Sequence, residues 1–210
     1  SLPSKSYPCY TAHHPYTQAS FLPGTYYVWY KVVGDENHND VAPACIAVTI
    51  AKKQIAKPAA DNSTFTYNGN YQTYAMNGDP AFIIENNVQK NAGSYTVTVT
   101  LQDTANYEWT DGTTAVLEYI FKIEQKEIGI SWSNTALTYN GAAQRPTATA
   151  TGVVTGGQIA LLLSAPETNA GSYTAMVHSI DGATAQNYKL PTNKSTSFTR
   201  FNMLKINNLV

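Results

Sequence analysis

The sequence predicts an all-β protein built from repeated β-sandwich modules, and three observations lead to this expectation. The hexapeptide NAGSYT occurs twice, at residues 91–96 and 169–174. Residues 94–103 alternate between apolar and polar side chains, which is the pattern of a half-buried strand. No segment shows the sustained helical period of an amphipathic helix. Together these observations favour copies of one strand-rich unit.

Other short motifs recur in the same order as the hexapeptide. TYNG stands at residues 66–69 and again at 138–141, and it precedes NAGSYT both times. The pair Asn-Tyr follows the hexapeptide, at residues 106–107 and 187–188. The separation between the two copies grows from TYNG to NAGSYT and again to Asn-Tyr. Because loops tolerate insertions and packed strands do not, a growing separation with the order kept indicates a repeated domain.

A third, weaker copy precedes these two. PGTYYVWY at residues 23–30 aligns with AGSYTVTV at residues 92–99. We therefore expect an incomplete first module at residues 1–54 and two further modules at 55–126 and 127–210. The opening strand and TYNG turn of the first module have no counterpart in the sequence. Two explanations stay open: the chain is a piece of a longer array, or another strand completes the module by edge pairing.

The joints between the predicted modules are short. Residues 48–60 and 121–133 run from the last strand of one module into the first strand of the next with hardly any linker. Short joints limit hinge motion between domains. The modules are therefore expected to form an extended, semi-rigid array.

Strand alternation assigns the faces of the predicted sheets. The residues expected to face a core are Tyr95, Val97, Val99 and Leu101 in the second module, and Tyr173, Ala175 and Val177 in the third. Asn-Gly at residues 68–69 and 140–141 is typical of a tight turn. Further strands are expected at residues 81–85, 116–123, 147–153, 159–163 and 195–201.

The repeated hexapeptide has a structural interpretation. Gly-x-Tyr at the start of a strand is similar to the tyrosine corner of immunoglobulin-like (Ig-like) sandwiches, in which the tyrosine hydroxyl bonds to the nearby backbone. The candidate corner residues are Tyr26, Tyr95 and Tyr173. The predicted fold class is thus all-β, with tandem Ig-like β-sandwich modules in an extended array. A grasp-like sheet with similar spacing stays open as an alternative.

These motifs carry a family resemblance. TYNG, NAGSYT, Asn-Tyr and a terminal strand ending in KIEQKEI resemble the bacterial Ig-like repeat families, including MBG-type domains, over residues 22–200. Members occur in tandem in secreted and cell-wall-attached proteins. The resemblance implies an extracellular or cell-wall-attached bacterial location and a role as spacer or adhesive surface. It provides no catalytic residues.

Composition narrows the classes of partner. Charged residues make up 13% of the chain, about half the usual share, and the net charge is −1. No basic surface is expected that would bind nucleic acid or an anionic membrane. No apolar run approaches the roughly 18 residues of a membrane-spanning helix, and residues 1–21 show no signal-peptide pattern.

Two groups of polar residues are candidates for metal sites. Asp35, Asn37 and Asn39 alternate in GDENHND as in the first half of a calcium loop, but the sixth position is Asp40 rather than glycine. A solvated hairpin loop is the preferred interpretation. A zinc site lacks paired C-x-x-C spacing among its candidates, which are Cys9, His13, His14, His38 and Cys45. No metal and no cofactor is expected.

The two cysteines leave two alternatives. Cys9 and Cys45 form a disulfide in an oxidising location, or both stay as thiols. Cys45 alternates with Ile46, Val48 and Ile50, which places its side chain on the outer face of the predicted strand.

The sequence shows no recognisable arrangement of catalytic residues. No G-x-S-x-G nucleophile motif occurs. The acids close in sequence are interpreted as solubilising charges at strand ends rather than a glycosidase pair: Asp103, Asp111, Glu118 and Glu124. The protein is not expected to be an enzyme.

The outer face of the first module departs from the repeat. Tyr27 and Trp29 stand where the second module has threonines. Exposed aromatics anchor sugars or proteins, pack against a neighbouring module or chain, or simply favour a strand, and all three alternatives stay open.

The preferred function is a non-catalytic structural or adhesive stalk of a larger bacterial surface protein, with neighbouring modules as partners. The alternatives are a module that binds host glycan or protein through Tyr27 and Trp29, and an accessory domain of a polysaccharide-degrading enzyme.

Overall fold

The computed structural model describes residues 22–202 and confirms the all-β prediction for them. Within that range there is no α-helix, and the one helical turn is a 3-10 helix, η1 (Ala185–Asn187). The chain divides into two compact units. Unit 1 consists of Ser1–Lys57 and Leu101–Thr114, and unit 2 of Pro58–Thr100 and Ala115–Val210.

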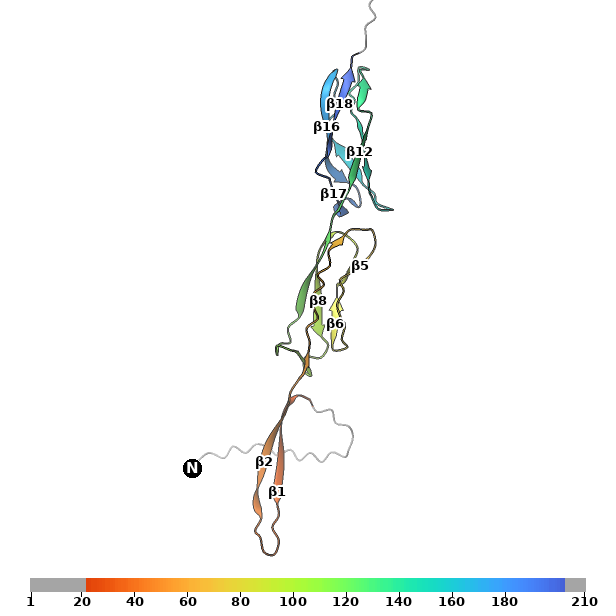
Figure 1. Ribbon diagram of the computed structural model, residues 1–210. Helices are drawn as coiled ribbons and strands as arrows, with labels where there is room; N and C mark the ends of the chain where they lie inside the picture. Colours follow the sequence, from red (N-terminus) through yellow and green to blue (C-terminus); the bar gives the residue numbers. More distant parts are fainter. Residues whose placement is uncertain (1–21, 203–210) are drawn as a thin grey trace, which may run out of the picture. The chain divides into compact units, whose positions relative to one another are not determined.

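Unit 1 holds a hairpin and a short parallel pair (Figure 1). Strand β1 (Gly24–Val32) pairs antiparallel with β2 (Val41–Ile50). Strand β3 (Lys53–Ile55) pairs parallel with β9 (Tyr107–Trp109), and the side chains of Ile55 and Trp109 are buried. The parallel pair therefore carries two buried apolar side chains at opposite register positions.

Unit 2 contains two mixed four-stranded sheets, the first of which we call the β8 sheet. Its strand order is β4-β10-β8-β6, with β4–β10 parallel and β10–β8 antiparallel. Its strands are β4 (Phe65–Thr66), β6 (Phe82–Glu85), β8 (Gly93–Leu101) and β10 (Leu117–Glu124). Beside them, β5 (Gln72–Thr73) pairs with β7 (Val88–Gln89).

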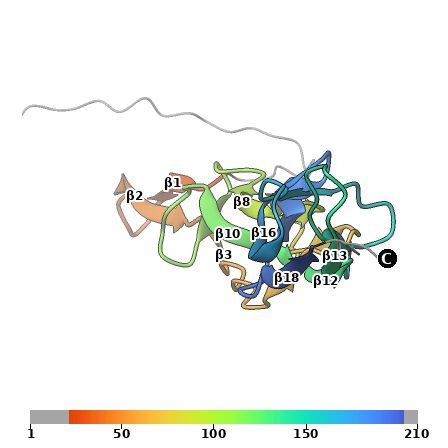
Figure 2. The same cartoon turned by 90° about the horizontal axis from the view of Figure 1, so that it is seen from above.

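The second sheet, the β16 sheet, has the order β13-β18-β16-β15, and Figure 2 shows β13, β18 and β16 from above. Its strands are β13 (Ala136–Thr138), β15 (Ala160–Leu163), β16 (Gly171–Asp181) and β18 (Ser195–Phe201). Two smaller pairs accompany it: β12 (Gly129–Ser133) with β14 (Thr147–Thr151), and β11 (Lys126–Glu127) with β17 (Tyr188–Lys189).

The two sheets repeat one another in order, direction and register. Tyr95 lies opposite Phe121 in the β8 sheet, and Tyr173 lies opposite Phe198 in the β16 sheet. Each sheet also has a short parallel edge strand, β4 or β13. The described residues therefore contain two β modules of the same design.

The predicted alternation is confirmed in both sheets. The inward residues of β8, Val97, Val99 and Leu101, are at most 4% exposed, as are Ala175 and Val177 of β16. The five further strands expected from the sequence agree with the structure to within one residue at each end, with one exception. Strand β14 ends at residue 151 rather than 153, because Gly152 turns the chain with a φ of 74°.

The main core cluster lies in unit 2 and joins residues from both modules. The Phe121 ring packs edge-on against Phe65, with 4.9 Å between centroids. The buried members of the cluster are Tyr67, Tyr74, Val97, Phe121, Ile123, Ile128 and Tyr188. Of these, Ile128 and Tyr188 belong to the second β module, so the two modules share one apolar contact.

A buried arginine holds the loops of the β16 sheet. Arg200 is 1% exposed and stands at the register position that Ile123 fills in the β8 sheet. Its guanidinium donates to four acceptors at 2.6–3.1 Å: the carbonyls of Ala142, Glu167 and Asn169 and the side chain of Gln144. Carbonyl partners compensate the cost of burying the cation, and the Tyr139 ring lies 5.5 Å from it.

Candidate binding surface

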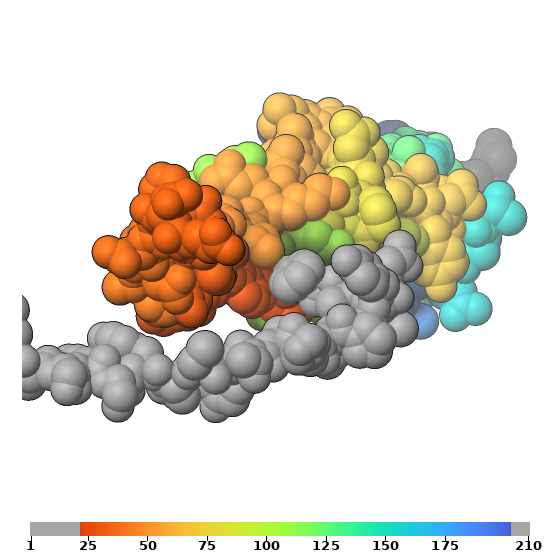
Figure 3. Space-filling view, turned by 90° about the horizontal axis from the view of Figure 1, so that it is seen from below, coloured from red at the N-terminus to blue at the C-terminus, as the bar shows by residue number. Residues whose placement is uncertain are grey.

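The β1–β2 hairpin presents the aromatic pair that the sequence singled out. Tyr27 and Trp29 are 63% and 52% exposed. Because strand residues two apart share a face, both side chains lie on one face of β1, with Lys31 next along it. Their partners across the hairpin are Ala47 and Cys45. The aromatic pair is thus accessible, and Figure 3 shows the hairpin residues in red and orange from below.

The opposite face of the hairpin is also open, which the sequence did not predict. Val28 and Val48 are 56% and 45% exposed, although Val97 and Phe121, at the matching positions of the β8 sheet, are 0% exposed. Among residues 22–202, no third strand pairs with β1 or β2. Without a covering layer, residues of core type stay in contact with solvent.

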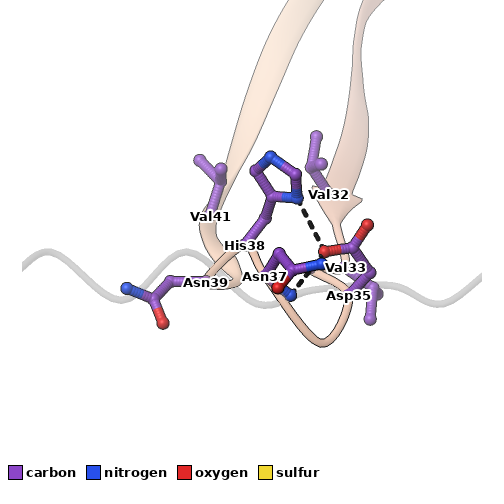
Figure 4. A pocket seen from close by; sticks show the side chains of 8 residues that line it. Val32, Val33, Asp35, Asn37, His38, Asn39 and Val41 are labelled. Carbon is purple, nitrogen blue, oxygen red and sulfur yellow. Dashed lines mark hydrogen bonds and ion pairs between the residues drawn. The ribbon is translucent and has the colours of Figure 1, made fainter.

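The acidic side chains of the hairpin loop form hydrogen bonds and ion pairs within the hairpin itself (Figure 4). Oδ1 of Asp35 accepts the backbone N–H of Asn37 at 2.8 Å and lies 2.6 Å from Nδ1 of His38. These contacts, the Asn37 N–H first, lower the pKa of Asp35. Asp40 accepts the N–H of Gly34 at 2.9 Å and pairs with Lys31 at 3.0 Å, which lowers its pKa in the same way.

The candidate calcium residues of this loop do not converge. Asp35 is engaged by the loop itself, and in Figure 4 the Asn39 side chain points away from it. In the part of the chain that the structure describes, no three His, Cys, Asp or Glu side chains are grouped to hold a metal ion. The geometry is that of an Asx-type turn closing a hairpin.

The cysteines and the remaining zinc candidates are only partly described. Cys45 is exposed on β2 and forms no disulfide with another described residue. Cys9, His13 and His14 lie outside the described residues. The Cys9–Cys45 disulfide therefore stays a prediction.

The three candidate corner tyrosines make one recurring contact. The hydroxyls of Tyr26, Tyr95 and Tyr173 donate to the carbonyl four residues earlier, at 2.6, 3.0 and 3.2 Å. A Cβ added to Gly93 would lie 3.2 Å from the Tyr95 hydroxyl, so the ring packs tightly over the glycine. The assignment of these residues to an Ig-type corner stays a prediction.

Three of the acids noted in the sequence have partners close by. Asp111 pairs with Lys57 at 2.5 Å, and this hydrogen bond is the main reason that its pKa falls to about 2. Asp103 accepts the Asn106 amide at 2.6 Å, and Glu124 pairs with Lys122 at 2.6 Å. Each of these three carboxylates therefore has a hydrogen-bond or ion-pair partner close by.

The structure places Asn187 and Tyr188 at the joint between the two β modules, a role that the sequence motifs did not predict. The side-chain oxygen of Asn187 accepts the N–H of Ala92 at 2.8 Å, and its amide donates to Asn91 at 3.2 Å. The next residue, Tyr188, packs edge-on against Tyr67 at 5.4 Å. The only available signal was the repetition of Asn-Tyr itself.

Comparisons with protein-family models, with curated proteins and with solved structures find no match to this chain. No described helix is long and apolar enough to cross a membrane.

Proposed function

We propose that this chain is a non-catalytic stalk segment of a bacterial surface protein, in which tandem Ig-like sandwich modules form an extended array. The observation that carries the proposal is the joint inside unit 2. One residue, Gln125, separates β10 from β11. Asn187 and Tyr188 are 1% and 2% exposed in contacts with the preceding module.

Such a joint suits a spacer for a physical reason. Bending it would expose the Tyr67–Tyr188 contact to water and leave the buried Asn187 amide without partners, and both changes cost free energy. A stalk needs this resistance, because a freely hinged chain would not hold a binding head or anchor at a set distance. The proposed location is extracellular or cell-wall-attached.

Spin labels test the stiffness of the joint. Glu118 and Ser179 are exposed on β10 and β16, one in each module. We would label cysteines at these positions after replacing Cys9 and Cys45 by serine, and measure the label–label distance distribution. A single narrow distribution is expected. A broad distribution in this otherwise unchanged chain would contradict the stalk.

Two asparagines provide a matched pair of variants for the same measurement. Asn187→Ala is expected to broaden the distribution, because it removes both side-chain hydrogen bonds across the joint. Asn106→Ala removes the equivalent asparagine of the earlier repeat, which bonds to Asp103 within its own loop, and should leave the distribution unchanged.

A second candidate function rests on the exposure of Tyr27 and Trp29. Flat, accessible aromatic rings stack on sugar rings and anchor protein partners. We infer that host glycan or host protein is the class of ligand for this face. Tyr27→Ala with Trp29→Ala should abolish retention on mucin-coated surfaces and glycan arrays. Tyr30→Ala, a change of similar size on the opposite face, should not, and unchanged retention in the double variant would exclude the aromatic face.

A further inference from the structure

The β1–β2 hairpin matches the central strand pair of both sheets in unit 2. Gly24 lies opposite Ile50, as Gly93 lies opposite Ile123 and Gly171 opposite Arg200. The central pair of each sheet therefore shows which neighbours such a hairpin takes.

In both sheets, the outer edge of the second strand pairs with the same kind of segment. Residues 65–69 read Phe-Thr-Tyr-Asn-Gly, and residues 137–141 read Leu-Thr-Tyr-Asn-Gly. Each begins with a short strand parallel to β10 or β18. The N–H of the tyrosine then donates to that strand, from Tyr67 to the carbonyl of Glu124 at 2.9 Å and from Tyr139 to that of Phe201 at 3.0 Å.

The first residue of the segment covers the apolar face. In the β8 sheet Phe65 packs on Phe121, whose position corresponds to Val48 in the hairpin. Val48 is 45% exposed and Phe121 is 0% exposed. In the described residues the edge of β2 has no partner strand. An isolated hairpin is only marginally stable, and exposed apolar patches mark sites of association.

Residues 1–23 do not contain this segment. In both sheets of unit 2 the parallel edge strand comes earlier in the chain than the central pair, as β4 precedes β8 and β13 precedes β16. The residues printed before Gly24 contain no copy of the motif Thr-Tyr-Asn-Gly. Residues 1–23 therefore do not contain a copy of the segment that covers the other two central pairs.

We propose that the β2 edge and the face formed by Val28 and Val48 bind an extended segment of the type Phe/Leu-Thr-Tyr-Asn-Gly, parallel to β2, which residues 1–23 do not contain. Backbone hydrogen bonds along the edge supply affinity, as in other strand additions, and the first side chain of the segment covers the valines. This face is opposite to Tyr27 and Trp29, so the site is independent of the proposed glycan surface.

Hydrogen exchange in the full chain tests the proposal with a synthetic peptide. The peptide STFTYNGN reproduces residues 63–70, and the control peptide has Asp in place of Phe65 and Tyr67. At about 100 times its dissociation constant, the first peptide should slow exchange of the hairpin amides by about 100-fold. The control peptide should have no effect, and equal protection by both peptides would overturn the proposal.

Variants on the two faces locate the binding site. Val28→Asp should remove the protection by the peptide, whereas Trp29→Asp, on the other face, should retain it. Neither change should alter exchange in the β16 sheet, which belongs to the other unit. Hairpin amides that are already protected without peptide would identify the chain itself as the occupant, and protection that rises with protein concentration would identify a second copy. Either result would overturn the proposal.

Discussion

The strand pairs β8–β10 and β1–β2 have the same register but opposite environments. Val97 and Phe121 are 0% exposed in the first pair, whereas Val28 and Val48 are 56% and 45% exposed in the second. Both are antiparallel pairs of long strands. The comparison teaches that pairing requires only two strands, but burial requires a further layer.

The largest expected effect on stability comes from replacing one side chain by alanine at the same register position in each strand pair. Phe121→Ala should destabilise the β8 sheet by about 3 to 5 kcal/mol, because it leaves a cavity in a closed core. Val48→Ala should change the opening free energy of the hairpin by less than about 0.5 kcal/mol, because the side chain is half exposed. Hydrogen exchange in the full chain measures both. Similar costs at the two positions would remove the distinction between the pairs.

Removing the tyrosine hydroxyls should show a smaller difference in free energy between the closed sheets and the open hairpin. Tyr95→Phe and Tyr173→Phe should each cost about 1 kcal/mol through loss of one hydrogen bond to a backbone carbonyl. Tyr26→Phe should cost less, because water replaces the lost partner more easily in the open hairpin. The measurement is exchange of the strand amides that follow each tyrosine. If both Tyr95→Phe and Tyr173→Phe leave exchange unchanged, neither ring acts as a tyrosine corner.

Acid is expected to have the smallest effect, and Asp111 is the residue that reports it in unit 1. The pKa of Asp111 is lowered from 3.8 to about 2, so its pairing with Lys57 stabilises the fold fully above pH 3.8. This contribution is lost as the pH falls through about 2. Exchange of the Thr113 N–H, which donates to Asp111 at 3.1 Å, should accelerate over that interval.

Asp111→Asn is the control for the acid experiment. In this variant the protection of the Thr113 N–H should not change over the same interval, because the amide does not titrate and does not form an ion pair with Lys57. The apolar core around Phe121 contains no carboxylate among its described members, and the β8 amides beside it should be unchanged over the same acid interval. A parallel loss of protection in that core would contradict the assignment of the effect to Asp111.

Part of the fold could be predicted because its signals are local. The alternation in β8 follows from side chains that point to opposite faces of one strand, and the glycine before each repeated tyrosine leaves room for the ring above it. The aromatic pair Tyr27 and Trp29 was identified in the same way. Its exposure needed only the alternation of β1 and the contrast with the threonines of β8.

Other features were not predictable because their causes lie far away in the chain. Asn187 is buried only because Asn91 and Ala92, from the preceding module, lie beside it. Its counterpart Asn106 bonds within its own loop instead. The two asparagines have the same local sequence signal, Asn-Tyr, so only the tertiary contact separates them.

The amino-acid sequence by itself determined the all-β class and the strand periodicity, since each depends on residues within a few positions of one another. It also determined the repetition of one unit, because the same motifs recur in the same order along the chain. Only the tertiary structure decided which valines are covered, how Arg200 satisfies the loop carbonyls, and where Asn187 and Tyr188 join two modules. The physical reason is that burial and hydrogen-bond satisfaction depend on which distant segments meet in space, whereas strand alternation depends on local backbone geometry.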